Sequence, residues 1–483
     1  MSKLYKIISI LIVTSFLVFV GCEDRTDLTA PAKPATGTAD FSTFVSIGNS
    51  LTAGYQSGAL FKSAQMYSFG NLISQQVGTE YVQPLLTDPG VGGRIEIKSL
   101  SPFSTVTDTK VGQLENASYP KPYNNLGIPG ALLVDILQAK DGASSISGNN
   151  AFFDIILRGK GTVLEQALSL KPTFITLWIG NNDILGYATS GGTLPHTPVA
   201  VFPQLYGQLA GAIAQTGAKV VAANIPNVAA IPFFTTVGPQ LAAAAPWALI
   251  GAGQAQLRQL GLPLNPNGVI FYESASGSNF GVFPATVGFA DSAAIRNLKI
   301  LFTLVSSTAQ PFLGDTTGAY YQSIGVTPPA GYDVSTPFGF SPLNPLPNSF
   351  VLDQAEIAEV NSVTASFNQT IADAVNANGW AFFDTFSFFN QVAQNGITVN
   401  GVKYTTEYVN GGLFSLDGVH LTNQGYGIVA NKFIKAINSK FNAKIPMINV
   451  TTLPGSLVLA KQVTFGKYGL PIFPPHTFDN LLF

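Results

Sequence analysis

Several apolar runs along the chain lack the polar alternation of a half-exposed strand: Phe41–Ile47, Thr173–Ile179 and Ala218–Asn224. Continuous apolar runs of this length are typical of strands that are buried on both faces. Helical periodicity follows or separates them, over residues 131–137, 162–169, 203–216, 352–376 and 424–441, and a shorter apolar run occupies Trp380–Phe383. This alternation predicts an α/β fold, a mostly parallel sheet with helices on both faces.

Two long segments interrupt this pattern. Residues 58–121 are rich in Gly, Ser and Pro and show one helical pattern, near 67–73. Residues 229–349 are far longer than a connection in an α/β unit needs, so they must have structure of their own. Helical stretches near 241–260 and 292–305, together with many Phe residues, predict a large helical cap over the strand ends. The last segment, 446–483, is predicted to pack across the domain that spans 41–445.

The N-terminus has the pattern of an export signal. Lys3 and Lys6 precede an apolar run over 7–20, which is too short to span a membrane comfortably but suits a signal-peptide core. Gly21-Cys22 at the end of that core resembles the lipobox of bacterial lipoproteins, in which the cysteine carries lipid. We therefore expect a signal peptide over 1–21, a lipid on Cys22, a flexible tether over 22–40, and a place in the cell envelope, at the outer membrane. The alternative is a cleaved secretory peptide without lipid.

Composition narrows the classes of partner. Hydrophobic residues make up 46% of the chain and charged residues only 10%, so the protein can bury a large core and is not disordered. The formal net charge is −2 and no basic run occurs, which argues against nucleic acid as a partner. Cys22 is the only cysteine, so no disulfide can form within the chain. The composition does not indicate an oligomeric state.

One candidate nucleophile stands where the first apolar run ends. Ser50 follows Gly48-Asn49, at the carboxyl end of the predicted strand, which is where open α/β sheets bind their ligands. A nucleophilic serine needs a base and an acid that orients the base. His420 has Asp417 three residues before it, a spacing that lets the carboxylate reach Nδ1 and leaves Nε2 for the serine.

The chain has two other histidines. His196 has no acid so close in sequence, whereas His476 has Asp479 three residues after it and stays a rival by spacing alone. Two strand-end residues are candidate donors to an oxyanion: the Gly127 N–H and the Asn182 side-chain amide. No Asp, Glu or His residues have the spacing of metal ligands, and we expect neither a metal nor another cofactor.

The segments around Ser50, Gly127, Asn182 and His420 together resemble the sequence blocks of the SGNH hydrolases, the GDSL esterase/lipase family. The blocks occur in the family's order, as Gly48-Asn49-Ser50-Leu51, the Gly127 loop, Gly180-Asn181-Asn182-Asp183 and Asp417-Gly418-Val419-His420. Asn49 departs from the family, which has Asp at that position. The resemblance implies a flavodoxin-like three-layer α/β/α fold.

The same resemblance implies the role of each residue. Ser50 is the nucleophile, His420 the general base and then acid, and Asp417 the orienting acid. The Ser50 and Gly127 N–H groups and the Asn182 amide form the oxyanion hole. The implied function is a lipid-anchored serine esterase or lipase that acts on a small-molecule ester or an acyl lipid, and an apolar cap predicts a preference for medium acyl chains over acetate. An acyltransferase, a carbohydrate acetyl esterase and a catalytically idle glycan- or lipid-binding lipoprotein stay open as alternatives.

Overall fold

Five parallel strands form the central sheet, in the order β11-β6-β5-β1-β4. Their bounds are Phe44–Gly48 (β1), Asn125–Gly127 (β4), Phe174–Trp178 (β5), Lys219–Ala223 (β6) and Ala381–Phe383 (β11). Numbered along the chain, this is the flavodoxin-like order 2-1-3-4-5, which reverses direction between the first and third strands. The predicted parallel sheet is confirmed, and each predicted apolar run overlaps one of its strands.

The computed structural model describes residues 34–101, 103–244, 269–275 and 287–455. All elements discussed here belong to one compact unit. The predicted signal peptide and Cys22 lie outside the described residues, as does most of the tail.

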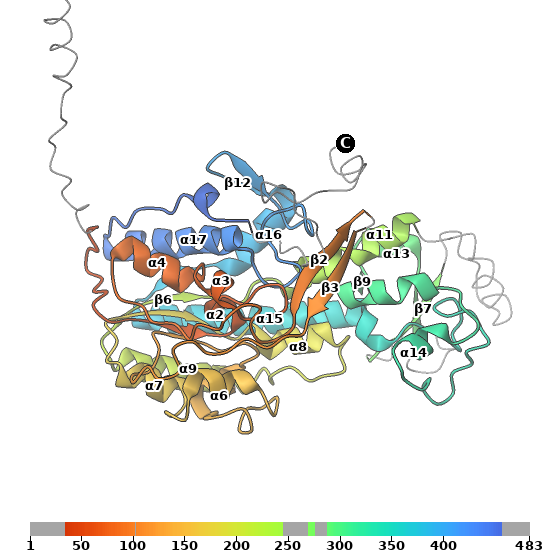
Figure 1. The fold of residues 1–483 in the computed structure, drawn as a ribbon, viewed down its shortest axis with the longest axis horizontal. Coiled ribbons are helices and arrows are strands. Elements are labelled where there is room, and N and C mark those ends of the chain that lie inside the picture. The colour runs from red at the N-terminus through yellow and green to blue at the C-terminus, as the bar shows by residue number, and fades with distance from the viewer. Residues whose placement is uncertain (1–33, 102, 245–268, 276–286, 456–483) are drawn as a thin grey trace, which may run out of the picture. The chain divides into compact units, whose positions relative to one another are not determined.

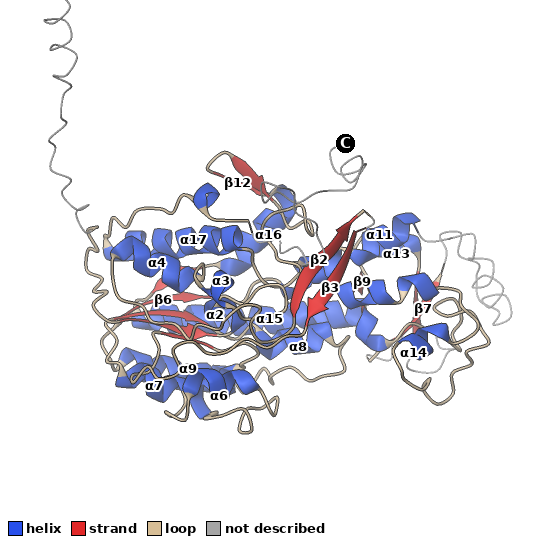
Figure 2. Cartoon of the chain, viewed as in Figure 1, coloured by secondary structure: helices blue, strands red, loops and turns tan. Residues whose placement is uncertain are grey.

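Helices cover both faces of the sheet (Figures 1 and 2). Helices α4 (Phe69–Val77) and α17 (Asn423–Phe441) pack together on one face, where α17 also contacts β11. On the other face, α9 (Phe202–Ala214) packs against α15 (Gln354–Asn378) and α5 (Leu133–Gln138), and α5 contacts α7 (Val163–Ser169). This is the three-layer α/β/α arrangement that the sequence predicted.

Local signals explain where the longest helices begin and end. Asp353 caps α15 in a reciprocal box with Glu356, and Gly379 ends the helix at φ 63°, a left-handed conformation that glycine adopts without strain. Thr422 caps α17 by accepting a hydrogen bond from the Gly425 N–H. The α17 start matters for function because His420 lies two residues before its cap.

The segment over 58–121 has more structure than its sequence indicated. It contains α3 (Lys62–Gln65), α4 and a long antiparallel hairpin of β2 (Arg94–Leu100) and β3 (Phe103–Asp108). Sequence patterns missed the hairpin because most β3 residues are exposed, so the strand does not bury one apolar face.

The cap is mixed rather than helical. It contains α10 (Pro232–Thr235), α11 (Val237–Ala244), the hairpin β7 (Ile270–Glu273) and β8 (Val287–Ala290), α13 (Ser292–Arg296), β9 (Leu301–Phe302), the 3-10 turns η3 (Leu304–Thr308) and η4 (Gln310–Phe312), and α14 (Ala319–Ser323). The helix expected over 292–305 is wrong beyond Arg296, because the chain extends there to pair β9 with β10 (Val351–Leu352). The helix expected over 241–260 lies largely outside the described residues. The cap has its own hydrophobic core, which includes Ile270, Phe302 and Tyr320.

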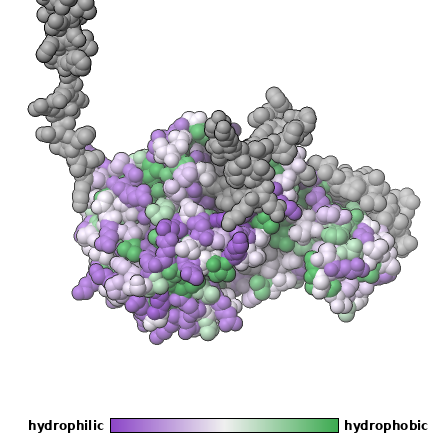
Figure 3. Space-filling model, in the orientation of Figure 1, coloured by the Kyte–Doolittle hydropathy of each residue, from purple (hydrophilic) through white to green (hydrophobic). Residues whose placement is uncertain are grey.

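The remaining described elements are short: α2 (Ser50–Ala53), α6 (Ala151–Leu157), α8 (Asn182–Thr189), α16 (Thr385–Asn395), β12 (Ile397–Val399), β13 (Val402–Tyr404), η1 (Val228–Ala230), η5 (Asn348–Phe350) and η6 (Val450–Thr452). Within the described part of the chain, no helix is both long and apolar enough to cross a membrane. The tail packs on the domain at least as far as Val450, which is buried. Hydrophilic residues cover much of the visible α/β surface although few residues are charged (Figure 3).

Candidate active site

Ser50 is the first residue of α2, and one residue separates it from the end of β1. The turn between them requires Gly48, because a Cβ there would collide with the Thr52 side chain and with the Trp178 carbonyl of β5. This close approach presents Ser50 at the carboxyl edge of the sheet, as the sequence predicted. The Ser50 residue is 8% exposed, so its hydroxyl is largely shielded from bulk water.

Asn49, the departure from the family pattern, caps α2. Its Oδ1 accepts a hydrogen bond from the Leu51 N–H at 3.1 Å. Its Nδ2 is buried and donates to no group among the described residues. An Asp in this place could make the same capping bond, so Asn49 preserves the local structure of the turn.

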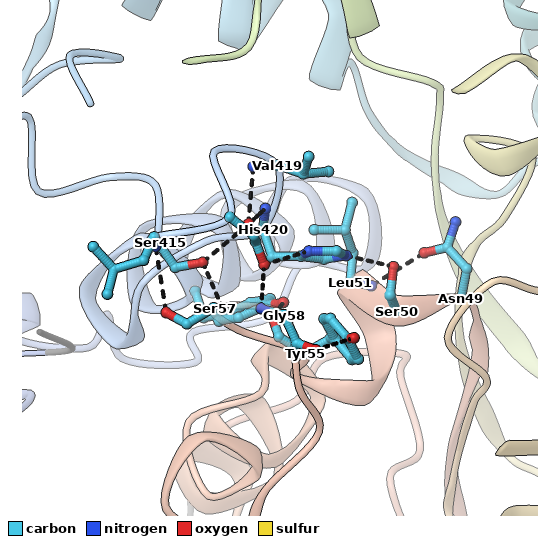
Figure 4. Close-up of polar contacts among 12 residues, drawn as sticks. Asn49, Ser50, Leu51, Tyr55, Ser57, Gly58, Ser415, Val419 and His420 are labelled. Atoms are coloured by element: carbon cyan, nitrogen blue, oxygen red, sulfur yellow. Dashed lines mark hydrogen bonds and ion pairs between the residues drawn. The ribbon is translucent and has the colours of Figure 1, made fainter. Parts of the chain in front are cut away.

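Ser50, His420 and Asp417 form one continuous line of polar contacts (Figure 4). His420 Nε2 lies 2.8 Å from Ser50 Oγ, and His420 Nδ1 lies 2.9 Å from Asp417 Oδ2. An ionised carboxylate can only accept hydrogen bonds, so Nδ1 must carry the proton. In the neutral ring Nε2 is then an acceptor, and the Ser50 hydroxyl donates to it. The tautomer is the one that a general base for Ser50 requires.

The Asp417 carboxylate is held by several donors. Its Oδ1 accepts the N–H groups of Val419 and His420 at 2.9 and 2.8 Å, and its Oδ2 accepts the Gly58 N–H at 2.9 Å. Burial opposes ionisation of this carboxyl, but the charge and hydrogen bonds of His420 outweigh burial and keep its pKa well below the usual range. Asp417 therefore stays ionised wherever the protein is folded near neutral pH.

A turn that sequence analysis overlooked supports this carboxylate. Ser57 and Gly58 have φ angles of 47° and 79°, and this left-handed turn directs the Gly58 N–H at Asp417. The Tyr55 hydroxyl donates to the Gly58 carbonyl, and the Tyr55 ring lies 4.7 Å from the His420 ring, centroid to centroid. Figure 4 shows Ser57 and Gly58 on the side of His420 away from Asn49, and Tyr55 below the His420 ring. The glycine in Ser57-Gly58 was the available signal, because it favours the left-handed turn.

His196, one of the two rival histidines, does not join this line of contacts. His196 lies beside Thr197 and Glu359, with Nδ1 2.9 Å from the Thr197 carbonyl and Nε2 3.1 Å from the Glu359 carboxylate. Both ring nitrogens therefore have partners away from Ser50. His476 lies outside the described residues.

Asn182 is the first residue of α8, after β5. Its Nδ2 donates to the Ala131 carbonyl at 2.9 Å. One of the two amide hydrogens is thus used within the protein, and this bond fixes the direction of the other. An amide fixed in this way is suited to donate to an oxyanion without reorganising first.

Gly127 is placed differently from the sequence expectation. It is the last residue of β4, and its N–H already donates to Asn125 Oδ1 at 3.0 Å. Gly130, three residues later, is exposed with φ 79°. Across the described residues, no group accepts a hydrogen bond from the N–H of Gly130 or of Ser50. The better-placed set of candidate oxyanion donors is therefore Ser50, Gly130 and Asn182. The sequence signal for Gly130 was its position, with Ala131, just before the helix.

Asp183 joins the loops that carry these donors. Its Oδ2 accepts the Leu133 N–H at 2.9 Å, and its Oδ1 accepts the Thr197 hydroxyl at 2.7 Å. Burial raises the pKa of the Asp183 carboxyl to about 6, although these two bonds partly offset the effect, and the charge of Asp135 adds to it. The side chain is thus a buried link between the segment after β4 and the segment after β5.

The described residues contain no group of three or more His, Cys, Asp or Glu side chains that could hold a metal ion. A family model described as GDSL-like Lipase/Acylhydrolase matches residues 44–268. The match includes Ser50, Gly130 and Asn182 and ends before Asp417 and His420, which the fold brings to the same site. No curated protein matches the chain.

Proposed function

We propose that this protein, which belongs to the GDSL-like lipase/acylhydrolase family, hydrolyses carboxylic esters through an acyl-enzyme on Ser50. Family membership supports a serine esterase, lipase or acylhydrolase activity in general terms. The observation that carries the specific proposal is the line of contacts from Asp417 through His420 to Ser50, at 2.9 and 2.8 Å. Three side chains in this order are the machinery that acyl transfer to a serine needs.

The chemistry follows from the proton positions. Ser50 Oγ attacks the ester carbonyl carbon while His420 Nε2 takes the hydroxyl proton, and the carbonyl oxygen becomes an oxyanion. The oxyanion accepts hydrogen bonds from the N–H groups of Ser50 and Gly130 and from Asn182 Nδ2. His420 then returns its proton to the alcohol oxygen as the bond to the carbonyl carbon breaks. Asp417 stabilises the imidazolium in both steps because it stays ionised.

Water completes the cycle. His420 Nε2 removes a proton from water as the water oxygen attacks the acyl carbon, and the proton then passes to Ser50 Oγ as it leaves. The products are a carboxylic acid, an alcohol and the free serine. An acyltransferase would differ only in the acceptor, since a sugar hydroxyl would replace water and all other steps would be shared.

A labelling experiment tests the nucleophile directly. A fluorophosphonate probe should modify Ser50 alone in the intact protein, as found by peptide mass spectrometry, and Ser50→Ala should prevent labelling and hydrolysis of p-nitrophenyl acetate. Folded Ser50→Ala that retains hydrolysis would refute the proposal. Product analysis with and without a sugar acceptor then separates hydrolase from acyltransferase, and absent turnover on all esters would favour the binding lipoprotein.

We further propose that the protein is a lipoprotein of the cell envelope, held at the outer membrane by a lipid on Cys22. The support is the sequence Gly21-Cys22 after an apolar core that follows Lys3 and Lys6. Burial of the acyl methylenes contributes roughly 0.8 kcal/mol each. Cys22→Ser should release the protein from the membrane fraction or leave an uncleaved precursor. Unchanged membrane partition and mobility of this variant would refute the lipid anchor.

A further inference from the structure

A hydroxyl group reaches the Asp417 carboxylate from a serine two residues earlier. Ser415 Oγ donates to Asp417 Oδ1 at 3.2 Å, within the turn over residues 415–420 that we call the catalytic turn. The same oxygen accepts the Ser57 N–H at 2.9 Å, so it connects the catalytic turn to the segment that follows α2. Both serines are buried, with 3% of Ser415 and 1% of Ser57 exposed. These two contacts are therefore largely shielded from water.

The chemistry of its two partners fixes the orientation of the Ser415 hydroxyl. A backbone N–H can only donate, so Ser415 Oγ must accept from Ser57. An ionised carboxylate can only accept, so the single proton of the hydroxyl is directed at Asp417. A hydroxyl that accepts one hydrogen bond is polarised by it and donates the other more strongly. Ser415 thus transmits a bond from a distant backbone group to the catalytic acid.

The backbone of Ser415 closes the catalytic turn. Its N–H donates to the His420 carbonyl at 2.7 Å, and its carbonyl accepts the Gly418 N–H at 2.9 Å. Phe414 and Leu421, the residues on either side of the turn, form an antiparallel β-bridge. These bonds hold Ser415 in place through its main chain, so its hydroxyl is positioned before a substrate binds.

The donors to Asp417 differ in what they connect it to. Two backbone N–H groups belong to the catalytic turn itself, so they move with it. The Gly58 N–H and the Ser415 hydroxyl instead connect the carboxylate to another segment, the first directly and the second through the Ser57 N–H. The first pair maintains the shape of the turn, whereas the second pair determines where the turn lies.

That other segment begins at the nucleophile. The Tyr55 N–H, directly after the C-cap of α2, donates to the Ser50 carbonyl at 3.1 Å. Contacts therefore follow a closed path, from the Ser50 backbone through residues 55–58 to the catalytic turn, and from His420 back to Ser50 Oγ. In Figure 4, Ser415 lies on the side of His420 away from Ser50. A displacement of the catalytic turn would change the 2.8 Å separation of His420 Nε2 and Ser50 Oγ.

We propose that Ser415 is a positioning residue for ester hydrolysis. Its hydroxyl holds the Asp417 carboxylate to the segment that carries the nucleophile, and so keeps His420 Nε2 within hydrogen-bonding distance of Ser50 Oγ. The inference rests on the proposed reaction at Ser50 and adds a residue to it. Because the Ser415 side chain acts on the acid, its loss should affect the rate of acyl transfer more than the binding of substrate.

Steady-state kinetics of full-length variants on p-nitrophenyl acetate test this role. Ser415→Ala removes one donor to Asp417 and leaves the buried Ser57 N–H without its acceptor. It should lower kcat by about ten- to a hundredfold and change KM by less than about twofold, because a displaced base slows the reaction without removing a substrate contact. Ser415→Thr keeps a hydroxyl at this position and should restore most of kcat. Fluorophosphonate labelling of Ser50 should slow in step with kcat, since it uses the same serine and base.

Tyr408→Phe is the matched control. The Tyr408 hydroxyl donates to the Leu416 carbonyl at 2.6 Å, so it binds the backbone of the catalytic turn rather than the carboxylate. We expect Tyr408→Phe to lower the thermal unfolding temperature and to keep kcat within about threefold of the unaltered protein. Ser415→Cys covers the case in which Ser415→Ala does not fold, because a thiol has nearly the same shape and is only a weak donor. It should lower kcat by about tenfold.

A folded Ser415→Ala or Ser415→Cys variant with the kcat of the unaltered protein would overturn the inference. So would a folded Ser415→Thr variant no more active than Ser415→Ala, or a loss of kcat in Tyr408→Phe as large as that in Ser415→Ala. The proposed function fails separately, if the unaltered protein hydrolyses no ester and Ser50 resists labelling. The two failures are distinguishable, because the unaltered protein still hydrolyses the ester when only the role of Ser415 is wrong.

Discussion

Asp183 accepts a hydrogen bond from the N–H of Leu133, with Oδ2 and N 2.9 Å apart, and so joins the loops that follow β5 and β4. The preceding residue makes a parallel connection, since Asn182 Nδ2 donates to the Ala131 carbonyl at 2.9 Å. Asn182 and Asp183 thus bind the same short segment, Asn182 through the Ala131 carbonyl and Asp183 through the Leu133 N–H. The Gly130 N–H, a candidate oxyanion donor, immediately precedes that segment, so its position relative to Asn182 depends on these bonds.

The buried carboxyl of Asp183 should make stability depend on pH. Its pKa is raised from 3.8 to about 6 in the folded protein, so the folded state holds this proton more tightly than the unfolded state does. Its contribution to folding is therefore greatest below about pH 3.8, falls as pH rises to about 6, and is constant above that. The difference in free energy of unfolding between Asp183→Asn and the unaltered protein should therefore change with pH. It should shift in favour of Asp183→Asn, by on the order of 3 kcal/mol, as the pH rises through this range.

Denaturant unfolding of both proteins at several pH values measures this difference. Asn can still accept the Leu133 N–H through Oδ1 while its Nδ2 faces the Thr197 hydroxyl, which can turn to accept. Asp183→Ala lacks both bonds and should lower kcat by up to about a hundredfold through misplaced oxyanion donors. A stability difference between Asp183→Asn and the unaltered protein that does not change with pH would contradict the raised pKa.

Asn182→Ala should lower kcat by about two to three powers of ten with a smaller effect on KM, because its amide acts on the charge that develops in the transition state. Asn181→Ala is the matched control, since the Asn181 side chain makes no hydrogen bond within the described structure. Steady-state kinetics on p-nitrophenyl acetate compares the two variants. Equal losses in both would indicate a general disturbance of α8 instead of a lost donor.

The three histidines should respond very differently to substitution. His420→Ala should lower kcat by several powers of ten while leaving the fold intact, because triad members act as a unit. His196→Ala should retain activity, since its contacts are with Thr197 and Glu359. His476→Ala should also retain it. If His476→Ala is inactive and His420→Ala is active, the base must be reassigned.

Stability measurements test whether Gly127 has a structural role. A Cβ at Gly127 would collide with the Ala53 backbone of α2, so Gly127→Ala should lower the free energy of unfolding by about 1–3 kcal/mol. Gly207 in α9 has open space around it, and Gly207→Ala should instead raise the free energy of unfolding by about 0.5–1 kcal/mol. Thermal or denaturant unfolding of Gly127→Ala and Gly207→Ala measures both changes. A Gly127→Ala variant with unaltered stability and reduced kcat would return Gly127 to the oxyanion hole.

Sequence patterns alone were enough to predict the parallel sheet and its helices, because strands buried on both faces are apolar throughout and helices repeat at 3.6 residues. They also singled out Ser50, Asp417 and His420, since the acid and the base are three residues apart and a turn of that length brings their side chains together. They could not predict the β2–β3 hairpin, whose residues are mostly exposed, or the strand β9 in the cap, which exists through pairing with the distant β10.

Only the tertiary structure decided which backbone N–H groups already donate hydrogen bonds within the protein. Gly127 and Gly130 are both loop-like glycines in sequence, but only the fold places the Asn125 side chain on the N–H of Gly127. The Gly58 N–H on Asp417 likewise joins residues 359 positions apart. Periodicity and spacing report which face of an element is buried and which neighbours in the chain can meet. Hydrogen bonds between distant segments depend on how those segments pack, and no local pattern encodes that.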